Sequence, residues 1–521
     1  MERFALDANL WHSGADGDPS SSAPRGQSWC IVNRMTRQDT RMSGERSSRA
    51  IRRAAEVYGF SLDDEGVERY VAELDATAEA LGMLEATDPA AEPATEVDEG
   101  DDPHNAIRYS FSLPGDDAAS GPLSNYRLGV KDNLAVAGVP MTCGSAALSY
   151  TPDYHATVVQ RLVDAGGDVR ATTNMDEFAF FTTGETCAHG PIGNPAVDGA
   201  VPGGSSSGSG AAVAAGHLDA ALGSDTGGSV RIPASYCGIV GLKPTHRSVS
   251  RFGFVDLAPS LDQVGVLATS VKLAGDVFET VAGPDIRDPS TLGMPTPDVS
   301  VPDTVDSLQV GVVEEAMTDA DPSVREQVDA TVEALADAGV VVDRISLPTF
   351  RVTPLAVLAT SNVEFARLVA DNGQVYGTGT GYSEGLRTAL DDLDSSRLGD
   401  NVVGQLLVGG GLLETTGGNH YVAAQRVRET FTREVDDALA AYDALVLPTT
   451  PTTAPSFGTV TDQEAFVRTI SHTAPFNLTG NPALSVPCGT ADGRPVGCQF
   501  VTARHDESTA LALGSAVERS S

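Results

Sequence analysis

Residues 201–210 read VPGGSSSGSG and residues 222–245 read LGSDTGGSVRIPASYCGIVGLKPT, with small residues over 211–222 that predict a helix between them. A glycine- and serine-rich stretch that stands alone is usually a flexible linker. Here the pattern of a packed core resumes directly after it. Paired glycines let the main chain approach a ligand closely, so the segment predicts a site for an anion or an oxyanion.

Two known serine and glycine designs fit this segment poorly. A phosphate loop needs a lysine after its second glycine, and no lysine precedes Lys243 in the stretch. Gly204 to Gly208 fits the GxSxG pattern that would make Ser206 an elbow nucleophile. That elbow must follow a strand, whereas residues 201–203, Val-Pro-Gly, predict a turn.

The motifs GGSSSGSG, SDTGGSVRIPA and CGIVGLKPT resemble those of the amidase signature family. The resemblance extends to Gly-Val-Lys-Asp-Asn at 129–133, Asn-Met-Asp-Glu-Phe at 174–178 and the segment 471–483, so it covers most of the chain. It implies an α/β fold, with a mixed central sheet flanked by helices and a helical N-terminal segment. It also implies hydrolysis of a carboxylic amide through an acyl-enzyme intermediate.

The resemblance assigns a catalytic triad. Lys131 is the lysine of the KDN motif, Ser205 is the serine that follows a cis peptide, and Ser229 is the nucleophile that ends DTGGS. The family spacing between the two serines favours Ser205 over Ser206 and Ser207. Ser207 stands where the family usually has glycine, which is a departure in the local loop.

The nucleophile loop also receives roles from the resemblance. The backbone N–H groups of Thr226, Gly227 and Gly228, together with that of Ser229, are implied to form the oxyanion hole. Asp225 and Arg231 bracket the loop, and we expect them to pair and brace it; the alternative is two unrelated local contacts.

The chemistry of a lysine base can be argued from the residues themselves. A serine hydroxyl needs an adjacent base, and burial between apolar neighbours such as Leu128 and Val130 would keep Lys131 neutral. An arginine cannot release its proton, yet this chain, which has only three lysines, places one here. The other two, Lys243 and Lys272, are expected to be structural.

Other candidate groups are given structural roles. His217 lies inside the predicted helix and is a poor candidate for the base. His189, His472, Cys143 and Cys187 are expected to be structural, because histidine and buried cysteine often are.

Charge and composition limit the partners. With 71 acidic against 34 basic residues and a net charge of −37, the chain is unsuited to neutralising the phosphates of a nucleic acid. A carboxylate-rich surface is screened in molar salt, so we expect a salt-adapted cytoplasmic protein; an acidic protein from a GC-rich genome is the alternative. Its six cysteines lack metal-ligand spacing, so no metal or cofactor is expected. No apolar run is long enough to span a membrane.

The domain organisation follows from composition. Residues 1–45 lack periodicity and are expected to be disordered or a misassigned extension, since Met35 and Met42 each offer a later start. Residues 46–104 are predicted to form a helical segment followed by an acidic linker. Residues 105–521 are predicted to form the catalytic domain.

The substrate is less constrained. Gly-Gly-Asn-His-Tyr at 417–421 resembles stand-alone acyl amidases, several of which are dimers, so we expect a small-molecule amide as the substrate and allow for a homodimer. The alternative is the glutamine-hydrolysing A subunit of a tRNA-dependent amidotransferase. Residues 470–474, Ile-Ser-His-Thr-Ala, lack the aspartate that typically holds the substrate amine in that subunit. A catalytically silent scaffold subunit is a third alternative. The substrate pocket is expected to lie on loops within 373–420.

Overall fold

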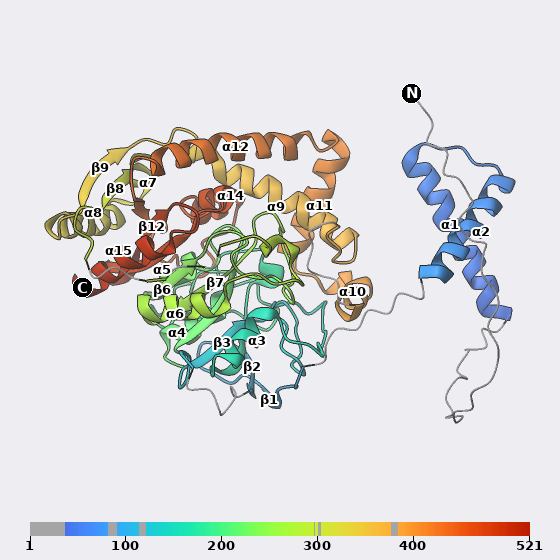
Figure 1. Ribbon diagram of the computed structural model, residues 1–521, viewed down its shortest axis with the longest axis horizontal. Helices are drawn as coiled ribbons and strands as arrows, with labels where there is room; N and C mark the ends of the chain where they lie inside the picture. Colours follow the sequence, from blue (N-terminus) through green and yellow to red (C-terminus); the bar gives the residue numbers. More distant parts are fainter. Residues whose placement is uncertain are drawn as a thin grey trace, which may run out of the picture. The chain divides into compact units, whose positions relative to one another are not determined.

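The chain forms two compact units, Met1–Thr87 and Asp88–Ser521. They are seen in a computed structural model (Figure 1) that describes residues 37–81, 91–113, 121–295, 297, 299–300, 304–376 and 384–520.

The first unit is a pair of helices, α1 (Arg37–Tyr58) and α2 (Asp64–Leu81). Ala55 and Val67 are buried, and the helical N-terminal segment is confirmed. The helix α1 begins earlier than predicted, inside the segment expected to be an extension, because arginine, glutamine and methionine are good helix formers. The rest of that segment, residues 1–36, lies outside the described residues.

The second unit is built on one 12-stranded sheet in the order β1-β2-β4-β3-β5-β7-β6-β11-β12-β10-β8-β9. Neighbours are parallel at β3–β4, β3–β5, β8–β9 and β8–β10, and antiparallel elsewhere. The predicted mixed sheet is therefore confirmed. The strands are β1 (Thr95–Glu99), β2 (Ile107–Ser112), β3 (Arg127–Lys131), β4 (Asp168–Thr173), β5 (Ala220–Asp225), β6 (Val240–Lys243), β7 (Gln263–Ala268), β8 (Gln309–Val313), β9 (Val341–Ile345), β10 (Ala444–Pro448), β11 (Ala483–Ala491) and β12 (Arg494–Thr502).

Helices flank this sheet, as predicted, and α9, α11 and α12 pack against one another (Figure 1). The helices are α3 (Thr157–Asp164), α4 (Ser207–Ala214), α5 (Arg231–Cys237), α6 (Val271–Val281), α7 (Glu314–Asp319), α8 (Pro322–Asp337), α9 (Thr353–Ala370), α10 (Glu384–Asp391), α11 (Asp400–Thr416), α12 (Asn419–Leu439), α13 (Gln463–Ile470), α14 (Pro475–Thr479) and α15 (Glu507–Ser520). Short 3₁₀ turns are η1 (Glu177–Ala179), η2 (Pro289–Thr291), η3 (Phe350–Val352) and η4 (Ser395–Arg397).

Part of the acidic stretch predicted as a linker is instead the edge strand β1. It pairs antiparallel with β2, and Asp98 lies opposite Ser110. Four of its five residues are exposed. Acidic side chains suit an edge strand because they discourage pairing with another chain, so composition alone does not separate such a strand from a linker.

The helix predicted over residues 211–222 is wrong in its second half. The helix α4 ends at Ala214, and β5 begins at Ala220 after a turn at Gly216, whose φ is +74°. The strand β5 is buried over its whole length between β3 and β7. Its small residues are compatible with either structure, and the central place in the sheet decides between them.

Candidate active site

The proposed base lies where the parallel strands β3 and β5 have their carboxyl ends. Lys131 is the last residue of β3, and Ser224 lies at the end of the adjacent β5. The carboxyl ends of parallel strands are the usual place for a ligand site in such sheets. Lys131 Nζ donates hydrogen bonds to Ser205 Oγ at 2.7 Å and to Ser224 Oγ at 2.8 Å.

The environment of Lys131 favours its neutral form. The side chain has no exposed surface, as its apolar neighbours predict. Burial lowers the pKa of Lys131 to about 7, and the carboxylates of Asp176, Asp225 and Asp262 only partly offset that effect. A lysine with this pKa exchanges a proton readily near neutral pH.

The loop that carries Ser205 is fixed by its main chain. The Gly204–Ser205 peptide is cis, and the Ser205 carbonyl accepts from the Asp176 amide at 3.2 Å. A Cβ on Gly204 would lie 2.0 Å from Asp176 Oδ2, so only glycine fits there. Ser207, which departs from the family pattern, donates to that same carboxylate at 3.2 Å and begins α4.

The alternative nucleophile Ser206 is fully buried, and its hydroxyl is already hydrogen-bonded to the main chain. Its Oγ donates to the Ser224 carbonyl and accepts from the Ser224 amide, both at 3.2 Å. The Ser206 amide donates to the Ser229 carbonyl at 3.1 Å, which ties the two loops together. His217 is exposed in the turn after α4 and not inside a helix, so it lies apart from these buried groups.

Ser229 lies just before α5, with only 5% of its surface exposed. It borders a small cavity of about 40 Å³ together with Thr226 and Gly227. Its Oγ has no hydrogen-bond partner among the residues that the structure describes. The main-chain hydrogen bond from Ser206 to Ser229 brings Ser229 next to the loop of Ser205, whose Oγ contacts Lys131.

One expected oxyanion donor is used elsewhere. The Gly228 amide donates to Asp225 Oδ1 at 2.8 Å, so the expectation that it is free for an oxyanion is wrong. Its φ is +133°, and a Cβ there would lie 2.1 Å from Thr473 Oγ1, so the glycine is required for packing. Within the described ranges no hydrogen bond occupies the amides of Thr226, Gly227 and Ser229.

Asp225 and Arg231 form the expected pair. They are joined by a 2.8 Å ion pair with both side chains fully buried. Burial alone would raise the pKa of Asp225, but the charge and hydrogen bonds of Arg231, together with Lys243 and Asn477, outweigh it and lower that pKa to about 2. Arg231 also donates to the Thr473 carbonyl at 2.8 Å and to Asn477 Oδ1 at 2.7 Å. The pair therefore links the nucleophile loop to the C-terminal segment.

The cavity beside Ser229 is mostly apolar. Side chains from the 179–182 turn, α9 and α13 surround it: Phe180, Phe181, Leu257, Val357, Leu358, Phe466 and Ile470. A second cavity of about 280 Å³ shares Phe181, Leu358 and Phe466 with it and extends to α11. Within the range 373–420, where the substrate pocket is expected, the described residues that line this second cavity are Gly404, Gln405 and Val408, and they lie on the helix α11.

The remaining candidates have structural partners. Lys243 is buried and donates to the Asn481 carbonyl, and Lys272 pairs with Asp276 on the surface of α6. Burial raises the pKa of the Cys143 thiol, and that of Cys187 to about 12, so both are poor nucleophiles. The rings of His189 and His472 contact Thr142 Oγ1 and the Pro448 carbonyl respectively.

Sequence reasoning missed the two side chains that complete the cluster. Ser224 Oγ accepts a hydrogen bond from Lys131 Nζ, and Asn477 Nδ2 donates to Asp225 Oδ1 at 2.9 Å. Their only signal is position, directly before Asp225 and inside the C-terminal motif.

The described residues form neither a metal site nor a membrane-spanning helix. No group of three or more His, Cys, Asp or Glu residues there could hold a metal ion. None of the helices in the described ranges is long and apolar enough to cross a membrane.

Comparison with known proteins shows similarity to amidases and to amidotransferase A subunits. The model of the Amidase family matches residues 75–511. The A subunit of the glutamyl-tRNA(Gln) amidotransferase from Halobacterium salinarum is 41% identical over 80% of this chain and 99% of its own length. The crystal structure of the same subunit from Thermotoga maritima is 31% identical, with a TM-score of 0.68 over 86% of this chain and 91% of its own. The 6-aminohexanoate cyclic dimer hydrolase is 28% identical, with a TM-score of 0.67 over 77% and 86%.

Proposed function

The chain belongs to the amidase signature family, whose members act on amide C–N bonds, and from that premise we propose that Ser229 is its nucleophile. Ser229 Oγ attacks the amide carbonyl carbon, and the amine leaves as an acyl-enzyme forms. Water then hydrolyses the ester to release the carboxylate and the free enzyme. The buried cluster around Lys131 supports this assignment.

Ser205 carries the proton in this scheme. Neutral Lys131 accepts the Ser205 hydroxyl proton across the 2.7 Å contact while Ser205 accepts the proton of Ser229. The same path returns a proton to the departing nitrogen. Ser224 holds Lys131 Nζ from a second side at 2.8 Å, which fixes the direction of the amine.

The amides of Thr226, Gly227 and Ser229 stabilise the negative oxygen of the tetrahedral intermediate. Removing one such donor costs other hydrolases roughly 10²–10³ in rate. The Gly228 amide instead holds the loop on Asp225, so that residue positions the donors and does not supply one.

The apolar lining of the cavity at Ser229 is the observation that selects the substrate. No described charged side chain borders this cavity, and a free amino acid such as glutamine needs partners for both its ammonium and its carboxylate. We therefore propose a stand-alone amidase for amides with an apolar acyl group, which packs on Phe181 and Phe466.

A second candidate is the glutamine-hydrolysing A subunit of a tRNA-dependent amidotransferase. The 41% identity over nearly all of the Halobacterium salinarum protein favours it, more strongly than any comparison favours the stand-alone enzyme. Under this reading the chain works with partner subunits. Against it, the C-terminal motif here reads Ser-His-Thr-Ala at 471–474.

The relatives also support the proposal of a salt-adapted cytoplasmic protein. Together with the net charge of −37, similarity to a Halobacterium protein is what a salt-dependent surface leads us to expect. A homodimer stays a proposal that sedimentation in molar salt tests.

Ammonia release separates the two candidates. Aliphatic and aromatic amides and glutamine are incubated with wild type, Ser229→Ala and Ser235→Ala in molar potassium chloride. Ser235 is a buried serine on α5 that the mechanism does not use, so its variant is the matched control. Hydrolysis of apolar amides that only Ser229→Ala abolishes supports the stand-alone enzyme. Cleavage of glutamine alone, or only with added subunits, supports the second candidate.

A further inference from the structure

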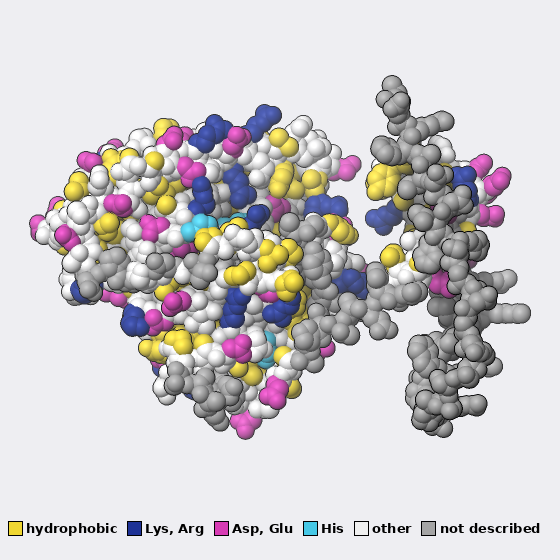
Figure 2. All heavy atoms as spheres, in the orientation of Figure 1, with side chains coloured by type: hydrophobic (Ala, Val, Ile, Leu, Met, Phe, Trp, Pro, Cys, Tyr) yellow, Lys and Arg dark blue, Asp and Glu magenta, His cyan; other side chains and the backbone are white. Residues whose placement is uncertain are grey.

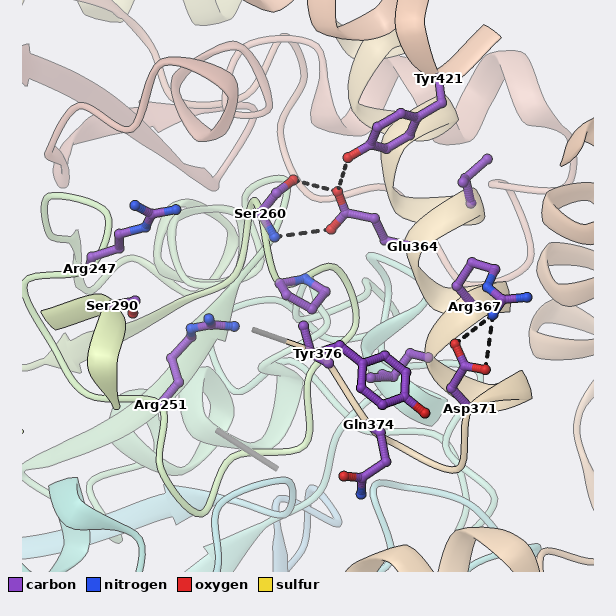
Figure 3. Close-up of a pocket in the computed structure, with 14 residues that line it drawn as sticks. Arg247, Arg251, Ser260, Ser290, Glu364, Arg367, Asp371, Gln374, Tyr376 and Tyr421 are labelled. Atoms are coloured by element: carbon purple, nitrogen blue, oxygen red, sulfur yellow. Dashed lines mark hydrogen bonds and ion pairs between the residues drawn. The ribbon is translucent and has the colours of Figure 1, made fainter. Parts of the chain in front are cut away.

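A larger cavity, here called the arginine pocket, lies apart from the catalytic cluster. Its volume is about 430 Å³, within the range of small-molecule sites, and it shares no lining residue with the cavity at Ser229. Arg247, Arg251 and Arg367 line it, with Glu364, Tyr376 and Tyr421. Figure 3 shows these side chains converging from α9, the segment 371–376 that follows it, α12 and the segment 247–260.

Most charges of the arginine pocket are already compensated. Arg251 pairs with Asp256, and Arg367 pairs with Asp371 at 2.7 Å. Glu364 accepts from the Ser260 amide at 3.0 Å, from Ser260 Oγ at 2.6 Å and from the Tyr421 hydroxyl at 2.8 Å. These contacts, dashed in part in Figure 3, hold the walls of the cavity in place.

Arg247 is the exception. Within the described ranges its guanidinium has no hydrogen-bond or ion-pair partner, although the chain has 71 acidic residues available to compensate 34 basic ones. Its φ of +73° lies in the region that favours glycine, and its amide donates to Gln263 Oε1 at 3.2 Å. Arg247 is exposed and lines the cavity, and backbone strain at such a position is a pointer to function.

The electrostatic field at His246, next to the pocket-lining Arg247, is positive. Burial, together with the charges of Arg251, Arg247 and Arg428, holds the pKa of the neighbouring His246 well below its usual range. Arg428 donates to the Ser260 carbonyl at the edge of the pocket. Figure 2 shows Lys and Arg side chains close to histidine on the visible face of this unit. In a chain of net charge −37, such a field is local.

We propose that the arginine pocket is a second binding site, for a small organic anion whose carboxylate or phosphate pairs with Arg247. A guanidinium fork matches both of these groups. The apolar part of the ligand packs on Pro259, Val363 and Leu368, which line the same cavity. The site lies outside the catalytic cluster, and the proposal does not depend on the identity of the amide substrate.

Calorimetry tests this site without a turnover assay. Benzoate and phenyl phosphate are titrated into wild type and Arg247→Gln in potassium chloride, with uncharged benzyl alcohol as the probe that lacks the anion. Arg519→Gln is the matched control, because Arg519 is exposed on α15 and lines no part of the pocket. We expect at least one anion to bind wild type and Arg519→Gln equally. Arg247→Gln should weaken that binding by about tenfold or more, the size of a lost charge-assisted contact.

Three further variants guard against a misfolded protein and against binding at the catalytic cluster. If Arg247→Gln does not fold, Arg367→Gln, on the opposite wall, should weaken the same binding, while Arg247→Lys should retain part of it. Ser229→Ala should bind the anion as wild type does, which separates this site from the proposed catalytic role. Equal binding by wild type and Arg247→Gln, or binding of benzyl alcohol as strong as that of benzoate, would overturn the proposal.

Discussion

Replacing Lys131 by methionine should abolish amide hydrolysis and yet stabilise the folded protein at neutral pH. Burial lowers the pKa of Lys131 from 10.5 to about 7. Between these values the unfolded chain binds a proton that the folded chain does not, so the free energy of unfolding rises with pH over that window. The folded protein therefore carries a cost at pH 7 that disappears above pH 10.5.

The magnitude follows from the width of that window. At about 1.4 kcal/mol per pKa unit, a shift from 10.5 to about 7 costs about 4 kcal/mol at pH 7 and about 1 kcal/mol near pH 9.5. Methionine removes this cost but forfeits the hydrogen bonds to Ser205 and Ser224, at about 1 kcal/mol each. We expect Lys131→Met to be about 2 kcal/mol more stable than wild type at pH 7.

Urea unfolding of wild type and Lys131→Met in potassium chloride, at pH 7 and near pH 9.5, measures the effect. The difference between the two proteins should shrink by about 3 kcal/mol over this interval, and the hydrogen-bond losses cancel in that comparison. Lys272→Met is the control, because Lys272 is 81% exposed and, among the residues that the structure describes, forms an ion pair with Asp276 alone. A difference that does not change with pH would mean that Lys131 is not held neutral, and its role as base would fail.

Four further predictions follow from the same contacts. The kcat/KM for an amide should rise with pH and reach a plateau above about 7, because only neutral Lys131 accepts a proton; a flat profile would argue against it. Arg231→Met should lower the free energy of unfolding by about 3–5 kcal/mol, since it leaves Asp225 buried without a counter-charge, and urea titration measures it. Gly228→Ala should cost about 1–3 kcal/mol and lower kcat, because its Cβ meets Thr473; an unchanged variant would refute the packing argument. Dilution of potassium chloride from molar to about 0.1 M should lower the melting temperature through unscreened carboxylate repulsion, and full stability in low salt would contradict salt adaptation.

The sequence predicts the parts of this protein where a motif and a physical requirement coincide. Lys131 is predicted because its type and its apolar neighbours both fit a neutral base, and the Asp225–Arg231 pair because the two charges bracket one short loop. The strand β5 is not predicted, since its small residues fit a helix equally well and only its place between β3 and β7 decides. The Gly228 amide is misassigned for a similar reason: the hydrogen bond to Asp225 that occupies it is a matter of orientation, which residue type does not encode.

Similarity to these relatives does not determine which amide this protein hydrolyses. The residues that perform the chemistry lie at strand ends and in glycine loops, and they serve amides of any kind. The side chains that border Ser229 come from α9, α13 and the turn at Phe180, which carry none of the motifs that define the triad. An identity of 41% to one chain of an amidotransferase is therefore compatible with a different acyl group, provided that Val357, Phe466 and their neighbours shape the cavity. Glutamine would have to place two charges against these apolar walls, at a cost of several kcal/mol for each unpaired ion, unless a partner protein supplied the missing counter-charges.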